Sequence, residues 1–186
     1  DSKILAAAGL LADAKVDVIG WSGTSSGWLG FDRDRQLVER IRERTGIPAT
    51  TAVLALNELM ALKDIRRLAL VTPYTRDVQA RIAANYAAIG IEIVAEQHLG
   101  IRVNHDFAGV SPAKLRELMG EVARARPQAI TTFCTNLRAA QLAPDIERDF
   151  GIPLLDTVST TVWGMVRAAG ASPAAITGWG ELFQWT

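Results

Sequence analysis

Cys134 is the residue in this chain best suited to move a proton to or from carbon, and it is the only cysteine among the 186 residues. Thr135 and Asn136 follow it directly, after the apolar run 129–133. Proton transfer from a thiol to a carbanion needs no second side chain. Nucleophilic triad chemistry would need an imidazole base, and the chain has only two histidines. We therefore expect Cys134 to act as a proton donor rather than as the nucleophile of a Cys–His hydrolase.

The expected surroundings of Cys134 follow from its place between a strand and a helix. The start of a helix lowers the pKa of an adjacent thiol and offers free N–H donors. We therefore expect an exposed or half-exposed thiol that faces a cleft, with a pKa below the ordinary value. The alternative is a small buried packing residue, which is the commoner fate of a lone cysteine.

An internal repeat places a second segment opposite the cysteine. Residues 17–25 form an apolar run that ends in Ser-Gly-Thr-Ser, and residues 129–136 form an apolar run that ends in Cys-Thr-Asn. Each copy continues into a charged helical stretch and then into the same tripeptide, Gly-Ile-Pro, at 46–48 and 151–153. The repeat predicts two half-domains of one design with a cleft between them. Gly23 and Cys134 occupy equivalent positions, so only one half carries a thiol.

Three further segments have polar groups that could bind an anion. The loop Gly23–Gly27 carries hydroxyls and backbone N–H groups between a strand and a helix. It matches neither a P-loop nor a dinucleotide fingerprint, and a plain turn is the commoner alternative. Tyr74, at the end of an apolar run, is either a phenol donor or a packing residue. Asn104 and His105 lie either in a surface loop or on the polar rim of the pocket.

The order of predicted elements favours an α/β fold. Strands are expected at 17–21, 67–71, 91–96, 129–133 and 154–155. Helices are expected at 1–15, 32–44, 53–62, 77–89, 112–124, 138–150 and 157–169, with loops at 23–30 and 100–109. Alternation of this kind predicts parallel sheets covered by helices. Ligands then bind beyond the carboxyl ends of the strands, which directs attention to the segments that begin at Gly23, Thr72 and Cys134.

Composition excludes several classes of function. The formal net charge is zero and no basic run stands out, so we expect no nucleic-acid partner. The longest apolar stretches are too short to span a bilayer, so we expect no membrane partner. One cysteine forms no internal disulfide, which fits a reducing compartment and predicts a cytoplasmic protein. Two histidines and one cysteine argue against a dedicated zinc site.

Three motifs together resemble the aspartate/glutamate racemase superfamily, and most of all its arylmalonate decarboxylase and maleate cis-trans isomerase branch. They are Ser22-Gly23-Thr24-Ser25, Leu70-Val71-Thr72-Pro73-Tyr74 and Phe133-Cys134-Thr135-Asn136-Leu137. The resemblance covers nearly the whole chain in the right order. It implies two pseudo-symmetric, Rossmann-like lobes with parallel sheets, formed by residues 1–70 with 158–186 and by residues 71–157. It also implies an active site in the cleft between them, no cofactor, and a first strand and helix ahead of residue 1 that contribute to the site.

The resemblance also implies roles for individual residues. Racemases and maleate isomerases of this superfamily use two cysteines, whereas the decarboxylase pairs Gly-Thr-Ser with one cysteine, as this chain does. Cys134 would protonate the carbanion. A small carboxylate substrate would be bound by Thr24, Ser25, Tyr74, Thr135, Asn136 and Asn104. Two features depart from the decarboxylase. Thr135 and Asn136 follow the cysteine, as in racemases and isomerases, and the polar pair Asn104 and His105 would hold a second carboxylate.

Three hypotheses follow. The leading one is cofactor-independent decarboxylation of a substituted malonate or other small dicarboxylate through an enediolate. The second is maleate or Asp/Glu racemase-like isomerisation, which Gly23 weakens because one thiol is missing. On the leading hypothesis, Gly23→Cys should introduce isomerase or racemase behaviour. The third is a non-catalytic protein that binds small anions and does not depend on Cys134.

Overall fold

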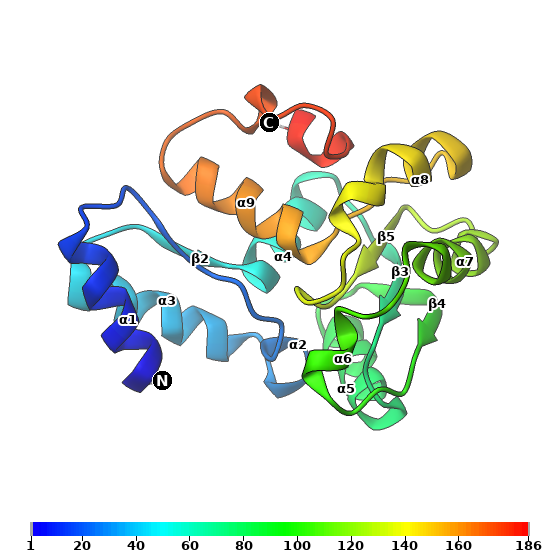
Figure 1. Ribbon diagram of the computed structural model, residues 1–186, viewed down its shortest axis with the longest axis horizontal. Coiled ribbons are helices and arrows are strands. Elements are labelled where there is room, and N and C mark those ends of the chain that lie inside the picture. The colour runs from blue at the N-terminus through cyan, green and yellow to red at the C-terminus, as the bar shows by residue number, and fades with distance from the viewer. Residues whose placement is uncertain (1, 186) are drawn as a thin grey trace.

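The computed structural model describes residues 2–185, which form two parallel β-sheets with helices packed around them (Figure 1). In the smaller sheet, β1 (Ile19–Trp21) pairs in parallel with β2 (Ala49–Thr51). The larger sheet has the order β4-β3-β5, all parallel, built from Arg67–Thr72 (β3), Glu92–His98 (β4) and Ala129–Thr132 (β5). The predicted α/β fold with parallel sheets is therefore confirmed.

The helices follow the strands in alternation. They are α1 (Ser2–Asp13), α2 (Ser26–Leu29), α3 (Asp32–Thr45), α4 (Ala52–Leu62), α5 (Arg76–Ala88), α6 (Asn104–Phe107), α7 (Pro112–Ala123), α8 (Ala143–Phe150) and α9 (Thr157–Ala168). Short 3-10 turns cover Ala140–Leu142, Pro173–Ala175 and Glu181–Gln184. α9 packs on β1, β2 and α4, whereas α7 packs on the larger sheet. The larger sheet includes residues 67–70, and the predicted division into lobes at residues 70 and 157 stays a prediction.

The Gly-Ile-Pro tripeptides have the same structural role in both copies of the repeat. Gly46 ends α3 with φ of 71° and Gly151 ends α8 with φ of 65°. This left-handed conformation favours glycine. The carbonyl of Pro48 then accepts from the N–H of Ile19 at 2.9 Å, and the carbonyl of Pro153 accepts from the N–H of Ile130 at 2.9 Å. Each tripeptide thus stops a helix and attaches the returning chain to the strand that precedes the site.

Two apolar clusters bury the faces of these elements. A small one, formed by Ala8, Ile19, Leu37 and Ile41, lies between α1, α3 and β1. The large one surrounds the three-stranded sheet and includes Phe133, Cys134 and Trp163. Helix starts are capped as expected for α7, where the Ser111 hydroxyl accepts from the N–H of Lys114 at 3.2 Å. The clusters hold the sheets so that the ends of β1, β3 and β5 face one space.

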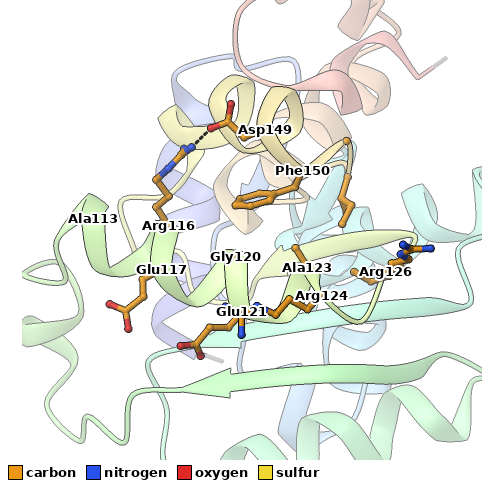
Figure 2. Close-up of a pocket in the computed structure, with 13 residues that line it drawn as sticks. Ala113, Arg116, Glu117, Gly120, Glu121, Ala123, Arg124, Arg126, Asp149 and Phe150 are labelled. Carbon is orange, nitrogen blue, oxygen red and sulfur yellow. Dashed lines mark ion pairs between the residues drawn. The ribbon is translucent and has the colours of Figure 1, made fainter.

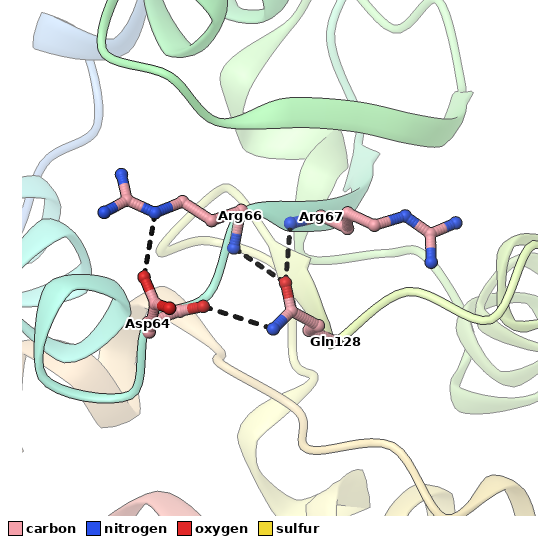
Figure 3. A network of polar contacts seen from close by, with 4 residues as sticks. All are labelled: Asp64, Arg66, Arg67 and Gln128. Carbon is pink, nitrogen blue, oxygen red and sulfur yellow. Dashed lines mark hydrogen bonds and ion pairs between the residues drawn. The ribbon is translucent and has the colours of Figure 1, made fainter.

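A polar clamp ties the starts of β3 and β5 together (Figure 3). The side-chain carbonyl of Gln128 accepts from the backbone N–H groups of Arg66 at 2.7 Å and Arg67 at 2.9 Å. Its amide group donates to the carbonyl of Asp64 at 3.1 Å. The clamp therefore supports the register of the two strands whose far ends carry Tyr74 and Cys134.

Several elements differ from the sequence-based prediction. β2 was not predicted, because a strand of three residues next to a helix leaves too short a pattern. Ser26–Leu29 and Asn104–Phe107 are short helices in predicted loops. The predicted helix 138–150 begins only at Ala143, after the 3-10 turn. The predicted strand 154–155 is a single bridge between Leu154 and Ile130. Within residues 2–185, no helix is both long and apolar enough to cross a membrane.

Candidate active site

A cavity of about 480 Å³ lies at the carboxyl ends of β1, β3 and β5. Its lining includes all seven predicted site residues, namely Thr24, Ser25, Tyr74, Asn104, Cys134, Thr135 and Asn136. Trp21, Ser22, Gly23, Trp28, Val78 and Phe107 complete it. The site residues come from segments far apart in the sequence. Parallel strands bring them together because their carboxyl ends meet at the same edge.

The loop after β1 reaches the cysteine through a close contact at Gly27. A Cβ on Gly27 would lie 2.4 Å from the ring of Phe133, so only glycine fits here without a shift. The carbonyl of Gly27 also accepts from the side-chain amide of Asn85 at 2.9 Å. These contacts attach α2 to α5 and to the segment that follows β5. They place Thr24 and Ser25 beside the residue that follows Phe133.

Thr24 and Tyr74 are joined by a hydrogen bond across the cavity. Their hydroxyl oxygens lie 2.7 Å apart. The ring of Tyr74 has edge contacts with Trp28, at 5.1 Å between centroids, and with Phe107, at 5.6 Å. Burial raises the pKa of Tyr74 well above its ordinary value, and the nearby thiol of Cys134 adds to the effect. The phenol is therefore protonated at physiological pH and available as a donor.

The environment of Cys134 differs from the sequence-based expectation. Its exposed fraction is 3%, so the prediction of an exposed or half-exposed thiol is wrong, although the residue does line the cavity. Burial raises its pKa, so the prediction of a lowered pKa is wrong as well. The hydroxyl of Tyr74 and the N–H groups of Asn136 and Leu137 offset this only in part. The physical reason is that residues 135–139 form a turn and irregular chain rather than the first turn of a helix.

The two residues after Cys134 close the rim of the cavity. The hydroxyl of Thr135 donates to the carbonyl of Ser22 at 3.3 Å. The side-chain amide of Asn136 donates to the side-chain carbonyl of Asn104 at 2.7 Å. The rim is therefore polar on the side of α6, and Asn104 and Asn136 form one pair there.

The histidines stand apart from this cavity. The side chain of His105 is 94% exposed, its ring lies 3.3 Å from the carboxylate of Asp106, and it borders a different cavity. His98 lies on β4, with its ring 3.0 Å from the carboxylate of Glu96. The expectation that His105 could join Asn104 at the pocket is thus wrong. The placement of both rings agrees with the rejection of a Cys–His hydrolase.

Sequence reasoning missed Asp156, a fully buried carboxylate behind the cysteine. It accepts from the hydroxyl of Thr132 at 2.7 Å and from the N–H groups of Val158 at 2.9 Å and Ser159 at 3.3 Å. Burial raises the pKa of Asp156 to about 6, and its charge in turn raises the pKa of Cys134. The available signal was an Asp directly before the predicted helix 157–169, a strong N-cap pattern.

A larger cavity, of about 1080 Å³, lies between α7 and α8 (Figure 2). Arg116 forms an ion pair with Asp149 across it and stacks over Phe150. None of the predicted site residues lines it. We place the candidate site in the smaller cavity, because all seven predicted site residues line it, including the thiol of Cys134. Among residues 2–185, no cluster of three or more His, Cys, Asp or Glu could hold a metal ion.

Comparison with known proteins gives consistent matches. The family model described as arylmalonate decarboxylase matches residues 2–183. Arylmalonate decarboxylase from Bordetella bronchiseptica is 35% identical over 170 residues, which cover 89% of this chain and 70% of that protein. Maleate isomerase from Pseudomonas putida is 25% identical over 170 residues, which cover 88% and 68%. A crystal structure of arylmalonate decarboxylase matches with a TM-score of 0.88 at 30% identity, covering 100% of this chain and 82% of that one.

Proposed function

This chain belongs to the arylmalonate decarboxylase family, and from its site we propose that it decarboxylates a substituted malonate without a cofactor. The observation that carries the proposal is the buried thiol of Cys134 beside the hydrogen-bonded hydroxyls of Thr24 and Tyr74. Because burial raises its pKa, the thiol holds its proton at physiological pH. Protonation of a carbanion needs a protonated acid, here the thiol, next to hydrogen-bond donors that hold the anion, here the hydroxyls of Thr24 and Tyr74.

The reaction begins with loss of one carboxylate as carbon dioxide. The C–C bond breaks, and its electron pair moves onto the α-carbon and the surviving carboxylate, which becomes an enediolate. Ser25, the free O–H group of the Thr24–Tyr74 pair and the N–H groups near Thr135 would donate to its oxygens. Preorganised donors of this kind contribute about 3 kcal/mol each to the stabilisation of the transition state.

The reaction ends when the thiol of Cys134 delivers its proton to the α-carbon. A C–H bond forms, the S–H bond breaks, and the thiolate recovers a proton from solvent. Since Gly23 carries no opposing thiol, the proton arrives from one side. The resulting monoacid would therefore form with one predominant configuration.

Maleate isomerisation is the second candidate, favoured by the polar rim. The side-chain amide of Asn136 donates a hydrogen bond to the side-chain carbonyl of Asn104 at 2.7 Å. A second carboxylate could be held by these two polar side chains. Gly23 argues against it, because a relative of this type would need a second thiol in the site. The sequence contains one cysteine and so does not supply two thiols.

Assays with substituted malonates and with maleate test the proposal. We expect release of carbon dioxide from malonates with two different substituents, such as one aryl and one alkyl group, one deuterium at the α-carbon in heavy water, and no fumarate from maleate. Cys134→Ala should abolish turnover while the melting temperature stays close to that of the unmodified protein. Efficient conversion of maleate would favour the isomerase. Binding of malonates without turnover, unchanged by Cys134→Ala, would favour the non-catalytic alternative.

A further inference from the structure

The side chain of Trp21 occupies the space in front of Gly23. A Cβ built on Gly23 would lie 2.6 Å from the indole Nε1, 2.7 Å from Cε2 and 3.0 Å from Cζ2. Real Cβ atoms do not approach other atoms below about 3 Å, since packed interiors leave no room for overlap. Trp21 and Gly23 both line the cavity that holds Cys134. The indole thus fills the position that any side chain at residue 23 would take.

An indole in this position is inert toward proton transfer. Its N–H group donates hydrogen bonds but accepts no proton, so it neither delivers a proton to the α-carbon nor removes one. Racemisation needs two groups on opposite sides of that carbon, one that removes a proton as the other supplies one. Cys134 provides the group on one side only.

We infer that Trp21 determines specificity at this site, because its indole keeps the β1 side of the cavity free of a second proton-transferring group. This inference rests on the proposed decarboxylation. On this inference, residue 23 must be glycine as long as residue 21 is tryptophan, because a side chain at 23 and the indole would occupy the same space. We therefore no longer expect Gly23→Cys alone to introduce racemase behaviour. The new thiol needs both the substitution at 23 and a smaller residue at 21.

A double-mutant cycle on the full chain tests the competition for space without any assay of activity. Gly23→Ala adds a Cβ and no thiol, so it isolates the steric effect. We expect Gly23→Ala and Gly23→Cys each to lower the melting temperature by about 4 °C or more. The same substitutions made in the Trp21→Ala background should lower the melting temperature by much less. Equal losses in both backgrounds would overturn the inference.

Stereochemistry gives the second readout. Each variant is incubated with an enantiopure product acid in heavy water, and exchange of the α-hydrogen and loss of optical purity are followed. We expect the Trp21→Ala/Gly23→Cys variant to racemise the acid at least about tenfold faster than Gly23→Cys alone, as acid–base catalysis by a second group would. Equal rates in these two variants would contradict the inference. Trp21→Leu replaces Trp21→Ala if the latter does not fold.

The two proposals fail in different ways. If the unmodified protein decarboxylates no malonate, the proposed function is wrong, yet the melting temperatures still decide whether Trp21 excludes a side chain at residue 23. If decarboxylation is observed and the cycle shows no coupling, the inference about Trp21 is wrong and the proposed function stands.

Discussion

The hydroxyl oxygens of Thr24 and Tyr74 lie 2.7 Å apart, and this hydrogen bond joins the loop after β1 to the segment after β3. The two residues are 50 positions apart in the sequence. Because the bond is buried and uses the proton of one hydroxyl, a substrate oxygen placed beside it would meet the remaining O–H group as a fixed donor. Preorganisation of this kind lowers the cost of stabilising charge as it develops.

Removal of the Tyr74 hydroxyl should therefore slow turnover. We expect Tyr74→Phe to lower kcat about 100-fold, the loss that follows removal of one such donor. Tyr86→Phe is the matched control, because Tyr86 is also a buried tyrosine but its hydroxyl forms no hydrogen bond within residues 2–185. That variant should keep kcat and its melting temperature. Similar losses of kcat in both variants would show that the effect comes from altered core packing rather than from loss of the hydroxyl donor at the candidate site.

The thiol of Cys134 should react slowly with alkylating agents near neutral pH. The thiolate is the reactive form, and burial raises the pKa of this group above its ordinary value. The rate should therefore stay below that of a free cysteine at pH 8 and rise only as the pH passes the raised pKa. Since the chain has one cysteine, the whole signal reports on this site. In urea the rate should return to that of an unfolded peptide. Fast alkylation of the folded protein at pH 7 would contradict the assignment.

The convergence of the candidate site residues on one cavity was predictable because parallel strands end at one edge. Thr24, Tyr74 and Cys134 each follow an apolar run, and this pattern was enough to bring them to one cavity. The internal repeat was readable for a similar reason, since Gly46 and Gly151 end helices by local backbone conformation.

The burial and the pKa of Cys134 were not predictable from local pattern. The burial depends on how the chain packs around residues 134–139, and it is the main reason that the pKa is raised. The charge of Asp156, whose carboxylate accepts a hydrogen bond from Thr132 across 24 positions of sequence, adds a smaller effect on the pKa. The position of the Trp21 indole, in the space that a Cβ on Gly23 would need, is also set by packing. Such features are set by tertiary packing, and spacing along the chain carries no trace of them.

Asp156 should make the stability of the protein depend on pH in mild acid. Burial raises its pKa to about 6 in the folded state, from about 3.9 in an unfolded chain. The folded state therefore binds more protons between these values, and the free energy of unfolding falls as the pH rises from 4 through 6. The contribution is fully present below the unfolded pKa and is lost above the folded one.

The Asp156→Asn variant isolates this effect. Asn keeps an acceptor for the N–H groups of Val158 and Ser159 but does not titrate. Relative to this variant, the unmodified protein should lose up to about 3 kcal/mol between pH 4 and pH 7, since each pKa unit corresponds to about 1.4 kcal/mol. Urea titrations at several pH values measure the difference. Asp34 and Glu147, whose pKa values are also raised by burial, affect both proteins alike. Parallel stability curves would contradict the prediction.

The Gln128 clamp should matter for stability and not for turnover. Its side chain bonds the backbone at Asp64, Arg66 and Arg67 and so joins the starts of β3 and β5 (Figure 3). Gln128→Ala removes three hydrogen bonds, and we expect a loss of about 1–2 kcal/mol in the free energy of unfolding, because water replaces part of each bond at this exposed position. The proposed catalytic groups lie at the opposite ends of these strands, so kcat should not change.

Gln141→Ala is the matched control for this prediction. Gln141 is also exposed, but its side chain makes a single bond, to the carbonyl of Arg138 three residues earlier. Its removal should change the free energy of unfolding by less than about 0.5 kcal/mol. Urea unfolding of both variants gives the comparison. A fall in kcat for Gln128→Ala, with no loss of stability, would mean that the clamp sets the position of Tyr74 against Cys134. Its main effect would then be on the geometry of the site.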